Sequence, residues 1–506
     1  MNVSFFQELL NTVAERGRAL LPKSLFGDEP ERGMQALVDA LVSGRGEASG
    51  VAIARQILHH YQILNGDERR AFFRYLAAAE VLKPNADNIA EAAENYLRDP
   101  SDKALARLQA VVENPRQEFF RRLNLAPGAT AEIVAMRRDL LRLPKDDPCF
   151  ALVDHDLRHL FYSWFNRGFL VLRRIDWQTP ASILEKIIQY EAVHEIRGWE
   201  DLRRRLDPAD RRCFAFFHPS LIDEPLIFVE VALSDVIADA IEPVLTEERK
   251  AEPLREPTTA TFYSISNCQE GLQGISFGNF LIKQVVEELA RELPSLTTFV
   301  TLSPVTVFSR WLDRLLADDT EGTLTDEDRA VLKALRDPEW HERLGDDEAL
   351  KSTMLALAAH YFMRAKSPRN KPVDPVARFH LGNGARLERI NWLGDTSNKG
   401  LQQAHGLMVN YRYHIKDIEK NHEAYANDGT IAASRAVKSL LRPAKAKGEP
   451  GKVLMIPALG GTSQATNGDN GKKAGQLLKS VATSKGTEPA PRAEARKPTG
   501  KPEDKT

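Results

Sequence analysis

One stretch decides the fold of the second half of the chain: ATFYSISNCQEGLQGISFGNFLIKQVVEELARE, residues 260–292. Its first seven residues, 260–266, are an apolar and aromatic run of the kind that predicts a buried strand. Residues 269–278 hold three glycines and predict a turn. Residues 279–293 repeat Leu281, Val285 and Leu289 at helical spacing. A strand, a glycine-rich turn and a helix in succession are typical of a domain that mixes helices with a sheet.

The glycine-rich turn has the composition of an anion site. Glycines let backbone N–H groups approach a phosphate closely, and the N-terminus of the following helix adds about half a positive charge. The turn is not a P-loop, because no Gly-Lys-Ser/Thr follows, and it lacks the first-strand context of a dinucleotide fingerprint. A phosphate cradle and an unliganded connection fit this pattern equally well.

Further strand and helix patterns surround this stretch. The other predicted strands are residues 213–217, 226–233, 298–302, 386–393 and 406–413. Helical patterns lie between them, notably at 326–335 and 348–365. We therefore expect a mixed α/β domain over residues 148–442.

The chain before this domain has a different character. Residues 1–147 read as one helix after another, separated by prolines such as Pro84, Pro100 and Pro115. Ser101 precedes one helical stripe as a capping residue. No alternating strand pattern interrupts them, so the fold class is α+β, with an all-α helical bundle for support or oligomerisation ahead of the mixed domain.

Residues 443–506 lose this periodicity. They hold twelve Lys and Arg against six Asp and Glu, with Pro, Gly, Ala, Ser and Thr filling most of the rest. Such a composition buries too little apolar surface to offset the entropy of ordering. We expect a disordered basic tail here.

Composition excludes several classes of function. The 506 residues carry a formal net charge of −2, which does not favour nucleic acid or an anionic membrane as partner. Cys149, Cys213 and Cys268 are far apart and lack CxxC spacing, which indicates a reducing compartment without disulfides or zinc. No apolar run is long enough to span a membrane, and Glu8 and Glu15 argue against an N-terminal targeting peptide. We expect a cytoplasmic protein.

Three polar side chains stand at the ends of predicted strands. Ser303 ends one strand and precedes Pro304, and no Gly-x-Ser-x-Gly elbow surrounds it, so a conventional serine hydrolase is poorly supported. His380 precedes a Gly-Asn-Gly turn that leads into a strand, and an unperturbed imidazole can exchange a proton near neutral pH. Tyr413 ends the last predicted strand. Each residue taken alone is more often structural than catalytic.

Taken together, these segments resemble the malonyl-CoA decarboxylase family over roughly residues 150–440. The matching stretches are residues 154–157, 164–165, 168–170, 191–194, 262–266, 271–274, 280–283, 302–304, 379–381, 383–385, 389–392 and 410–413. The strand, turn and helix also resemble the CoA-binding segment of the acetyltransferase-like (GNAT) fold, although the glycines are spaced differently.

The resemblance implies a helical bundle followed by a GNAT-like catalytic domain that converts malonyl-CoA to acetyl-CoA and CO₂ without a metal or an organic cofactor. It implies Ser303 and His380 as the catalytic pair, with Ser264 and Tyr413 as supporting polar residues. It also implies a malonyl-CoA-binding loop: Gln273, Gly274, Ile275, Ser276, Phe277, Gly278 and Asn279. Ser276 stands where family members can carry Glu, which leaves any function of that carboxylate in doubt here.

Other functions remain open on the sequence. The same fold supports an acyl-CoA acetyltransferase or a non-catalytic CoA-binding scaffold, and Ser303 as a nucleophile would make a thioesterase. The family also implies a homo-oligomer acting in fatty acid metabolism or malonate catabolism. Lys283 and Arg412 are candidates to hold the CoA 3′-phosphate, and malonyl-CoA and methylmalonyl-CoA are equally compatible with the sequence.

Overall fold

The computed structural model describes residues 30–43, 46–246, 256–275, 281–319, 322–368 and 370–442, together with Thr12. All of these residues belong to one compact unit. The predicted basic tail, residues 443–506, lies outside the described residues.

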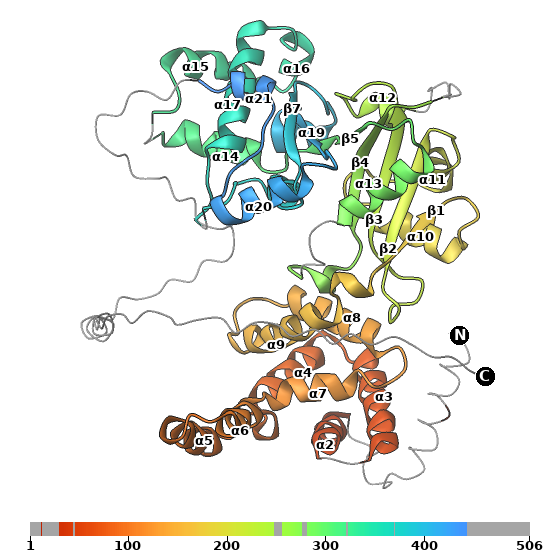
Figure 1. Cartoon of the computed structure of the whole chain (residues 1–506), viewed down its shortest axis with the longest axis vertical. Coiled ribbons are helices and arrows are strands. Elements are labelled where there is room, and N and C mark those ends of the chain that lie inside the picture. Colours follow the sequence, from red (N-terminus) through yellow and green to blue (C-terminus); the bar gives the residue numbers. More distant parts are fainter. Residues whose placement is uncertain are drawn as a thin grey trace, which may run out of the picture. The chain divides into compact units, whose positions relative to one another are not determined.

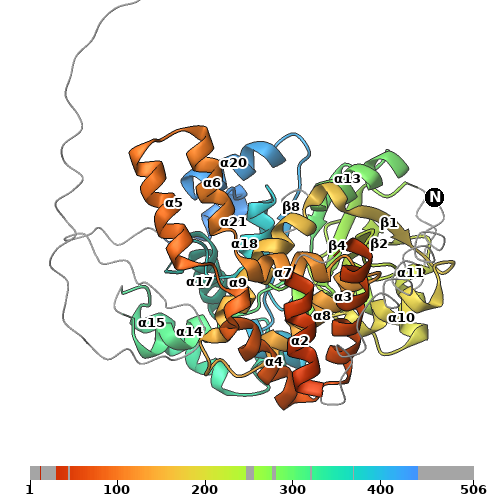
Figure 2. The ribbon, with the colours of Figure 1, turned by 90° about the horizontal axis from the view of Figure 1, so that it is seen from below.

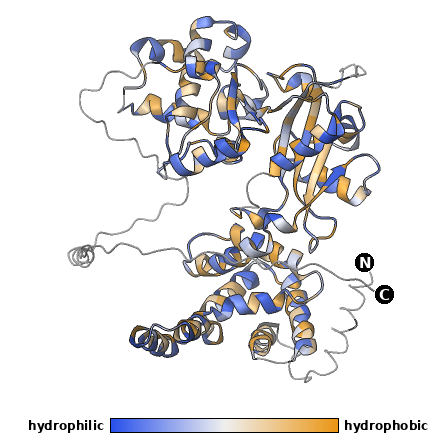
Figure 3. Ribbon diagram, viewed as in Figure 1, coloured by the Kyte–Doolittle hydropathy of each residue, from blue (hydrophilic) through white to orange (hydrophobic). Residues whose placement is uncertain are grey.

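Between residues 30 and 164, the described part of the chain forms helices and no strand. Asn65 caps the helix that begins at Gly66, in a capping box with Glu68, and Ser101 caps the helix that begins at Asp102, as its sequence predicts. Figure 3 shows that polar and apolar residues alternate along these helices. The helices are α2 (Pro30–Val42), α3 (Glu47–Ile63), α4 (Gly66–Ala78), η2 (Glu80–Leu82), α5 (Ala86–Arg98), α6 (Asp102–Val112), α7 (Pro115–Leu123), α8 (Ala129–Arg142) and α9 (Cys149–Trp164).

These helices share an apolar core that includes Phe73, Phe119, Phe120 and Phe161. The packing continues through α9, which lies against α4, α7 and α8, past the predicted domain boundary at residue 147. By contrast, α5 and α6 lie side by side as a hairpin (Figure 2), and α6 has no buried residue. The first part of the chain is thus a helical region with a projecting hairpin.

The following residues combine strands with helices. The strands are β1 (Val171–Ile175), β2 (Arg211–Phe217), β3 (Pro225–Ser234), β4 (Thr259–Asn267), β5 (Thr298–Thr301), β6 (Ser303–Pro304), β7 (Arg386–Asn391) and β8 (Met408–Arg412). The helices are η3 (Arg167–Phe169), α10 (Ala181–Tyr190), α11 (Trp199–Leu206), α12 (Glu242–Leu245), η4 (Glu270–Leu272), α13 (Leu281–Glu292), α14 (Phe308–Ala317), α15 (Asp326–Val331), η5 (Leu332–Arg336), α16 (Trp340–Arg343), α17 (Glu348–Met363), α18 (Pro375–Gly382), α19 (Asn398–Ala404), α20 (Ile418–Asp428) and α21 (Arg435–Ser439).

One sheet contains all of these strands, in the order β1-β2-β3-β4-β5-β8-β6, with β7 paired to β8. Strands β1 to β4 are antiparallel, and β2, β3 and β4 run side by side in Figure 1. Strands β4 and β5 are parallel and are joined through η4 and α13. The antiparallel meander, the parallel pair and the connecting helix confirm the predicted α+β class.

The parallel pairing of β4 and β5 is short. Its last register pair is Phe262 with Thr301, and the N–H of Leu302 then donates to the carbonyl of Phe262. Strand β4 continues to Asn267, whereas Ser303 turns away to pair with Val409 of β8. The two strands therefore part beyond Phe262, and side chains can line a space between them.

The sequence prediction also differs from the structure at strand β1 and at His380. Strand β1 was not predicted, because it lies at the edge of the sheet and buries one of its five residues, so it has no clear apolar pattern. His380 was expected in a connection before a turn, but it lies in helix α18. The pair Asp374-Pro375 is a helix start, with Asp374 accepting from the N–H of Ala377 at 2.8 Å.

Candidate active site

A cavity of about 270 Å³ lies where β4 and β5 part. Tyr263, Ile265 and Asn267 of β4 line one wall. Ser303 of β6 and His380 of α18 line another. Elements that are far apart in sequence thus bring the two predicted catalytic side chains to one space.

A chain of hydrogen bonds joins the polar side chains of this cavity. The hydroxyl of Tyr413 lies 2.8 Å from Nδ1 of His380, and Nε2 of His380 lies 3.3 Å from Oγ of Ser303. The hydroxyl of Ser303 donates to Oγ1 of Thr301 at 2.8 Å, and Oγ1 of Thr301 also accepts from the N–H of Tyr411 at 3.1 Å. The structure therefore brings Ser303, His380 and Tyr413 together and adds Thr301.

Sequence analysis did not single out Thr301. It stands two positions before Ser303, and residues two apart along an extended chain share a face. The pattern Thr-x-Ser at the end of a strand was therefore a signal for a second hydroxyl beside the first.

Burial fixes the protonation of these groups. His380 is 2% exposed, and desolvation lowers its pKa to about 3, so the free imidazole is neutral near pH 7. Burial raises the pKa of Tyr413 well above its usual value, so the phenol keeps its proton. When that proton is donated to Nδ1 of His380, the single ring hydrogen lies on Nε2. The hydrogen-bond partners thus assign an Nε2–H directed toward Ser303 and the cavity.

The ring of His380 is also held by packing. It stacks on Tyr411, with ring centroids 4.6 Å apart and an interplanar angle of 22°. The neighbouring Phe379 ring lies against it edge-on. Stacking and the Tyr413 hydrogen bond together restrict how the imidazole turns.

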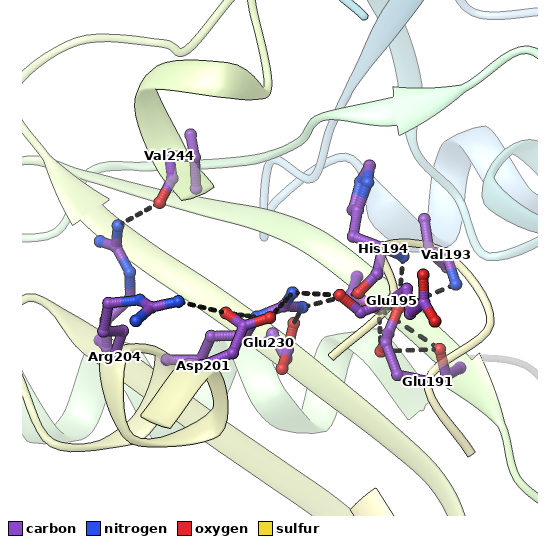
Figure 4. A network of polar contacts seen from close by, with 12 residues as sticks. Glu191, Val193, His194, Glu195, Asp201, Arg204, Glu230 and Val244 are labelled. Atoms are coloured by element: carbon purple, nitrogen blue, oxygen red, sulfur yellow. Dashed lines mark hydrogen bonds and ion pairs between the residues drawn. The ribbon is translucent and has the colours of Figure 1, made fainter. Parts of the chain in front are cut away.

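Ser264, a predicted supporting residue, does not contact this chain of hydroxyls. Its Oγ lies 2.8 Å from both carboxylate oxygens of Glu191. Glu191 also accepts from the backbone N–H groups of Val193 at 2.8 Å and His194 at 2.7 Å (Figure 4). Ser264 therefore helps to hold residues 191–195, and Val193 from this loop lines the cavity.

An ionic network holds the same loop from its other side (Figure 4). Arg205 donates to the carbonyl of His194 at 2.8 Å and to that of Glu195 at 2.9 Å. It also pairs with Glu230 at 3.2 Å. Glu230 is fully buried, and desolvation raises its pKa to about 8 despite the guanidinium beside it. The loop position thus depends on a buried contact between Arg205 and Glu230 in the sheet domain.

The predicted malonyl-CoA-binding loop is described only at its start. Gln273 and Gly274 are exposed, and Ile275 is buried, while Ser276, Phe277, Gly278 and Asn279 lie outside the described residues. Gly274 has a φ of +77°, which favours glycine.

Side chains of the helical region hold this turn. Arg137 of α8 donates to the carbonyls of Gly271 at 2.6 Å and Gln273 at 3.0 Å. The hydroxyl of Tyr162 of α9 donates to the carbonyl of Gly274 at 3.0 Å. The helical region therefore positions the turn that leads into the predicted loop.

A second cavity, of about 910 Å³, lies beside this turn. Helix α8 contributes Arg138 and Arg142 to its wall, and residues 267–275 contribute the other side. Asn267 lines both this cavity and the cavity of Ser303 and His380. A ligand extended past Asn267 reaches both spaces.

The two residues expected to hold the CoA 3′-phosphate are engaged elsewhere. Lys283 forms ion pairs with Glu419 and Glu287. Arg412 lies 3.7 Å from Glu388. Neither residue lines either of these cavities. Among the helices that the structure describes, none is long and apolar enough to cross a membrane.

Two solved structures are similar to this chain over most of its length. The malonyl-CoA decarboxylase from Rhodopseudomonas palustris is 53% identical, with 81% of this chain and 99% of that chain covered and a TM-score of 0.77. The enzyme of the same name from Agrobacterium vitis is 55% identical, with 81% and 100% covered and a TM-score of 0.77.

A more distant relative and two family models have the same description as these solved structures. The mitochondrial malonyl-CoA decarboxylase of Anser anser anser is 38% identical over 347 residues, which are 64% of this chain and 68% of that protein. The model of the malonyl-CoA decarboxylase N-terminal domain matches residues 82–165, and that of the C-terminal domain matches residues 168–450. With more than half of its length matched by the C-terminal model alone, the chain belongs to the malonyl-CoA decarboxylase family.

Proposed function

We propose that this protein is a carboxy-lyase that converts malonyl-CoA to acetyl-CoA and CO₂, with Ser303 and His380 at the reacting atoms. The observation that carries the proposal is the 3.3 Å contact between Ser303 Oγ and His380 Nε2 at the wall of the cavity between β4 and β5. The membership of the chain in its family supplies the chemical class of the substrate.

Charge stabilisation is the first requirement of this reaction. Loss of CO₂ from a malonyl thioester leaves an enolate, so negative charge moves onto the thioester oxygen. A fixed donor aimed at that oxygen lowers the barrier by roughly 3–4 kcal/mol. The Nε2–H of His380 is such a donor. The hydroxyl of Ser303 donates to Oγ1 of Thr301 in the free protein and becomes a second donor when it exchanges this acceptor for the substrate oxygen.

Proton supply is the second requirement, because the overall reaction consumes one proton. The malonyl carboxylate beside the buried ring favours the imidazolium, so His380 takes up a proton as substrate binds. The hydroxyl of Tyr413 then turns to accept from Nδ1–H. After CO₂ departs, Nε2 delivers its proton to the new carbanion carbon, and the ring returns to the neutral form.

The thioester itself delocalises the developing charge, so this mechanism needs neither a metal nor an organic cofactor. We expect kcat to be unchanged after dialysis against a chelator. An activity that falls on dialysis and returns with a divalent cation would contradict this part of the proposal.

The predictions of a homo-oligomer, a cytoplasmic location and a function in malonate catabolism belong to the same proposal. Light scattering of the purified protein measures the number of subunits directly.

Product analysis tests the activity. Purified protein incubated with malonyl-CoA is expected to yield acetyl-CoA and CO₂ by mass spectrometry. Free CoA with malonate would identify a thioesterase, and bound but unchanged malonyl-CoA would favour a scaffold.

Substitution at His380 tests the assignment of residues. His380→Asn removes the proton donor at Nε2, and loss of general acid catalysis lowers kcat by roughly 10²–10⁴-fold. Calorimetric titration with CoA is expected to give nearly the same Kd for both proteins. Turnover at the unaltered rate in this variant would overturn the assignment.

A further inference from the structure

The cavity of Ser303 and His380 is too small for the whole substrate. Its volume of about 270 Å³ lies below the roughly 300–1,000 Å³ of pockets that enclose drug-sized ligands, and CoA is larger than most such ligands. The nucleotide end of CoA must therefore bind outside it. The adjoining cavity of about 910 Å³ has the necessary size and shares Asn267 with the smaller one.

Two arginines supply cationic groups to the wall of the larger cavity, which also carries three glutamates. Arg138 and Arg142 are four residues apart on α8, so both side chains leave the same face of the helix. Among the described residues that line this cavity, Arg138 and Arg142 are the ones with a lysine or arginine side chain. A guanidinium group can donate two parallel hydrogen bonds to the oxygens of one phosphate, so this helix face is suited to bind a phosphate ester.

The carboxylates that line the same cavity have polar or charged partners of their own. Glu191 accepts hydrogen bonds from Ser264 and from two backbone N–H groups. Glu224 pairs with Lys186 at 2.6 Å. Glu270 differs, because its partner is Arg142 itself, at 2.5 Å. This pair is solvent-exposed and is therefore weak and exchangeable.

Arg138 is less well neutralised than Arg142. Its guanidinium lies 3.1 Å from Asp139, and the same carboxylate pairs with Arg69 at 2.9 Å. The carboxylate of Asp139 is therefore shared between Arg69 and Arg138, and 41% of the Arg138 side chain is exposed. Arg138 thus shares its nearest carboxylate with Arg69 and stays partly exposed at the cavity wall.

Helix α8 is fixed relative to the turn that faces these arginines. Gly271 approaches α8 so closely that a Cβ at this position would lie 2.0 Å from the carbonyl oxygen of Val134. Arg137 holds the carbonyls of Gly271 and Gln273 from the same helix. Because helix and turn form one rigid wall, Arg138 and Arg142 occupy set positions beside the glycine-rich turn.

We propose that helix α8 provides the phosphate subsite for CoA, with Arg138 and Arg142 binding phosphate groups of its nucleotide end. On binding, Arg142 exchanges the carboxylate of Glu270 for a phosphate. The inference rests on the proposed function for its substrate class. It assigns to the helical region a direct contact with the substrate, in place of Lys283 and Arg412.

Kinetics with two thioesters test the subsite. Malonyl-pantetheine carries the same reacting group as malonyl-CoA but has no phosphate. The double variant R138A/R142A is expected to raise KM for malonyl-CoA by about tenfold to hundredfold, because charge-assisted hydrogen bonds are lost. Its kcat, and its kcat/KM for malonyl-pantetheine, are expected to stay within about twofold of the parent values.

Two further variants sharpen the result. Arg74→Ala removes an exposed arginine of the helical region that pairs with Asp147 and lies outside the cavity lining, so both thioesters are expected to react as before. Glu270→Gln removes the competing carboxylate and is expected to lower KM for malonyl-CoA. A variant that weakens an unrelated part of the fold would not produce these opposite shifts.

Other outcomes overturn the subsite. Equal losses with both thioesters in R138A/R142A would show a structural effect, and an unchanged KM for malonyl-CoA would show that the arginines bind no phosphate. Calorimetric titration with CoA separates this question from catalysis. If the parent protein binds CoA but turns over neither thioester, the proposed function fails, while a weaker Kd in the double variant still supports the subsite.

Discussion

The hydroxyl of Thr301 accepts hydrogen bonds from Ser303 and from the N–H of Tyr411, so one atom sets the direction of the Ser303 hydroxyl. Thr301→Val keeps the shape of the side chain and removes this acceptor. We expect kcat to fall by about tenfold or more with a smaller change in KM, because Ser303 loses its orientation. Burying an unpaired N–H of Tyr411 is also expected to cost about 1–3 kcal/mol in unfolding free energy.

Thr301→Ser is the matched control, since it restores the hydroxyl without the methyl group. Steady-state kinetics and urea unfolding of both variants measure the effect. If the Ser variant loses as much kcat as the Val variant, the hydroxyl is not what positions Ser303.

The buried ring of His380 makes stability depend on pH. Its folded pKa of about 3 lies below the unfolded value near 6.5, so the unfolded state binds the proton first. The contribution of the neutral ring to stability is fully present above pH 6.5 and is lost as pH falls toward 3, by up to about 1.4 kcal/mol per pH unit.

His380→Asn removes this dependence. We expect the unfolding free energy of the parent protein, relative to that of the variant, to be smaller at pH 5.5 than at pH 7.5. Urea unfolding at both pH values measures it. The same difference at the two pH values would mean that folding does not lower the pKa of His380.

At the scale of helices and strands, the close contact between η4 and α8 leads to a testable prediction. Gly271→Ala places a Cβ where the carbonyl of Val134 already lies, so the turn or the helix must move. We expect KM for malonyl-CoA to rise and the protein to lose roughly 1–3 kcal/mol of stability by overpacking. The substitution Gly429→Ala is a control for loss of a glycine, because its Cβ meets no atom within 4 Å even though its φ of +64° adds strain. Equal KM values in the Gly271 variant and the parent would contradict the prediction.

Elements also show which parts of the fold the sequence predicts. Strand β4, the turn and α13 are strongly patterned because β4 is buried on both faces and α13 on one. Strand β1 leaves most of its residues exposed or half-buried, so its pattern is weak. The Asp374-Pro375 pair at the start of α18 is a local sequence signal for a helix, and this helix contains His380.

At the scale of the whole molecule, contacts between residues far apart in sequence bring the site together, and local sequence patterns do not predict such contacts. Ser303 and His380 were predicted as a pair through a family resemblance, and their approach depends on the register of β6, β8 and α18. The bond between Arg137 and the carbonyl of Gly271 joins residues 134 positions apart, and local periodicity carries no information at that separation. The helical region was accordingly expected to serve support or oligomerisation rather than to line a cavity with Arg138 and Arg142.

If CoA contacts both α8 and the glycine-rich turn, its binding stabilises both parts of the chain together. At a free concentration of 100 times Kd, CoA is expected to add about 2.7 kcal/mol to the unfolding free energy. Thermal unfolding should then show one transition that moves to higher temperature. Two transitions, of which only one shifts, would show that CoA contacts only one of the two parts.

The close approach of Gly271 to Val134 also limits which substitutions can accumulate in relatives of this chain. A lineage cannot add a side chain at position 271 unless the backbone of a helix more than a hundred residues upstream shifts with it. The helical region and the sheet domain therefore cannot change in sequence independently at this contact, even though their folds differ in class. An engineer who builds chimaeras from relatives of this chain would need to transplant α8 and the turn as one cassette.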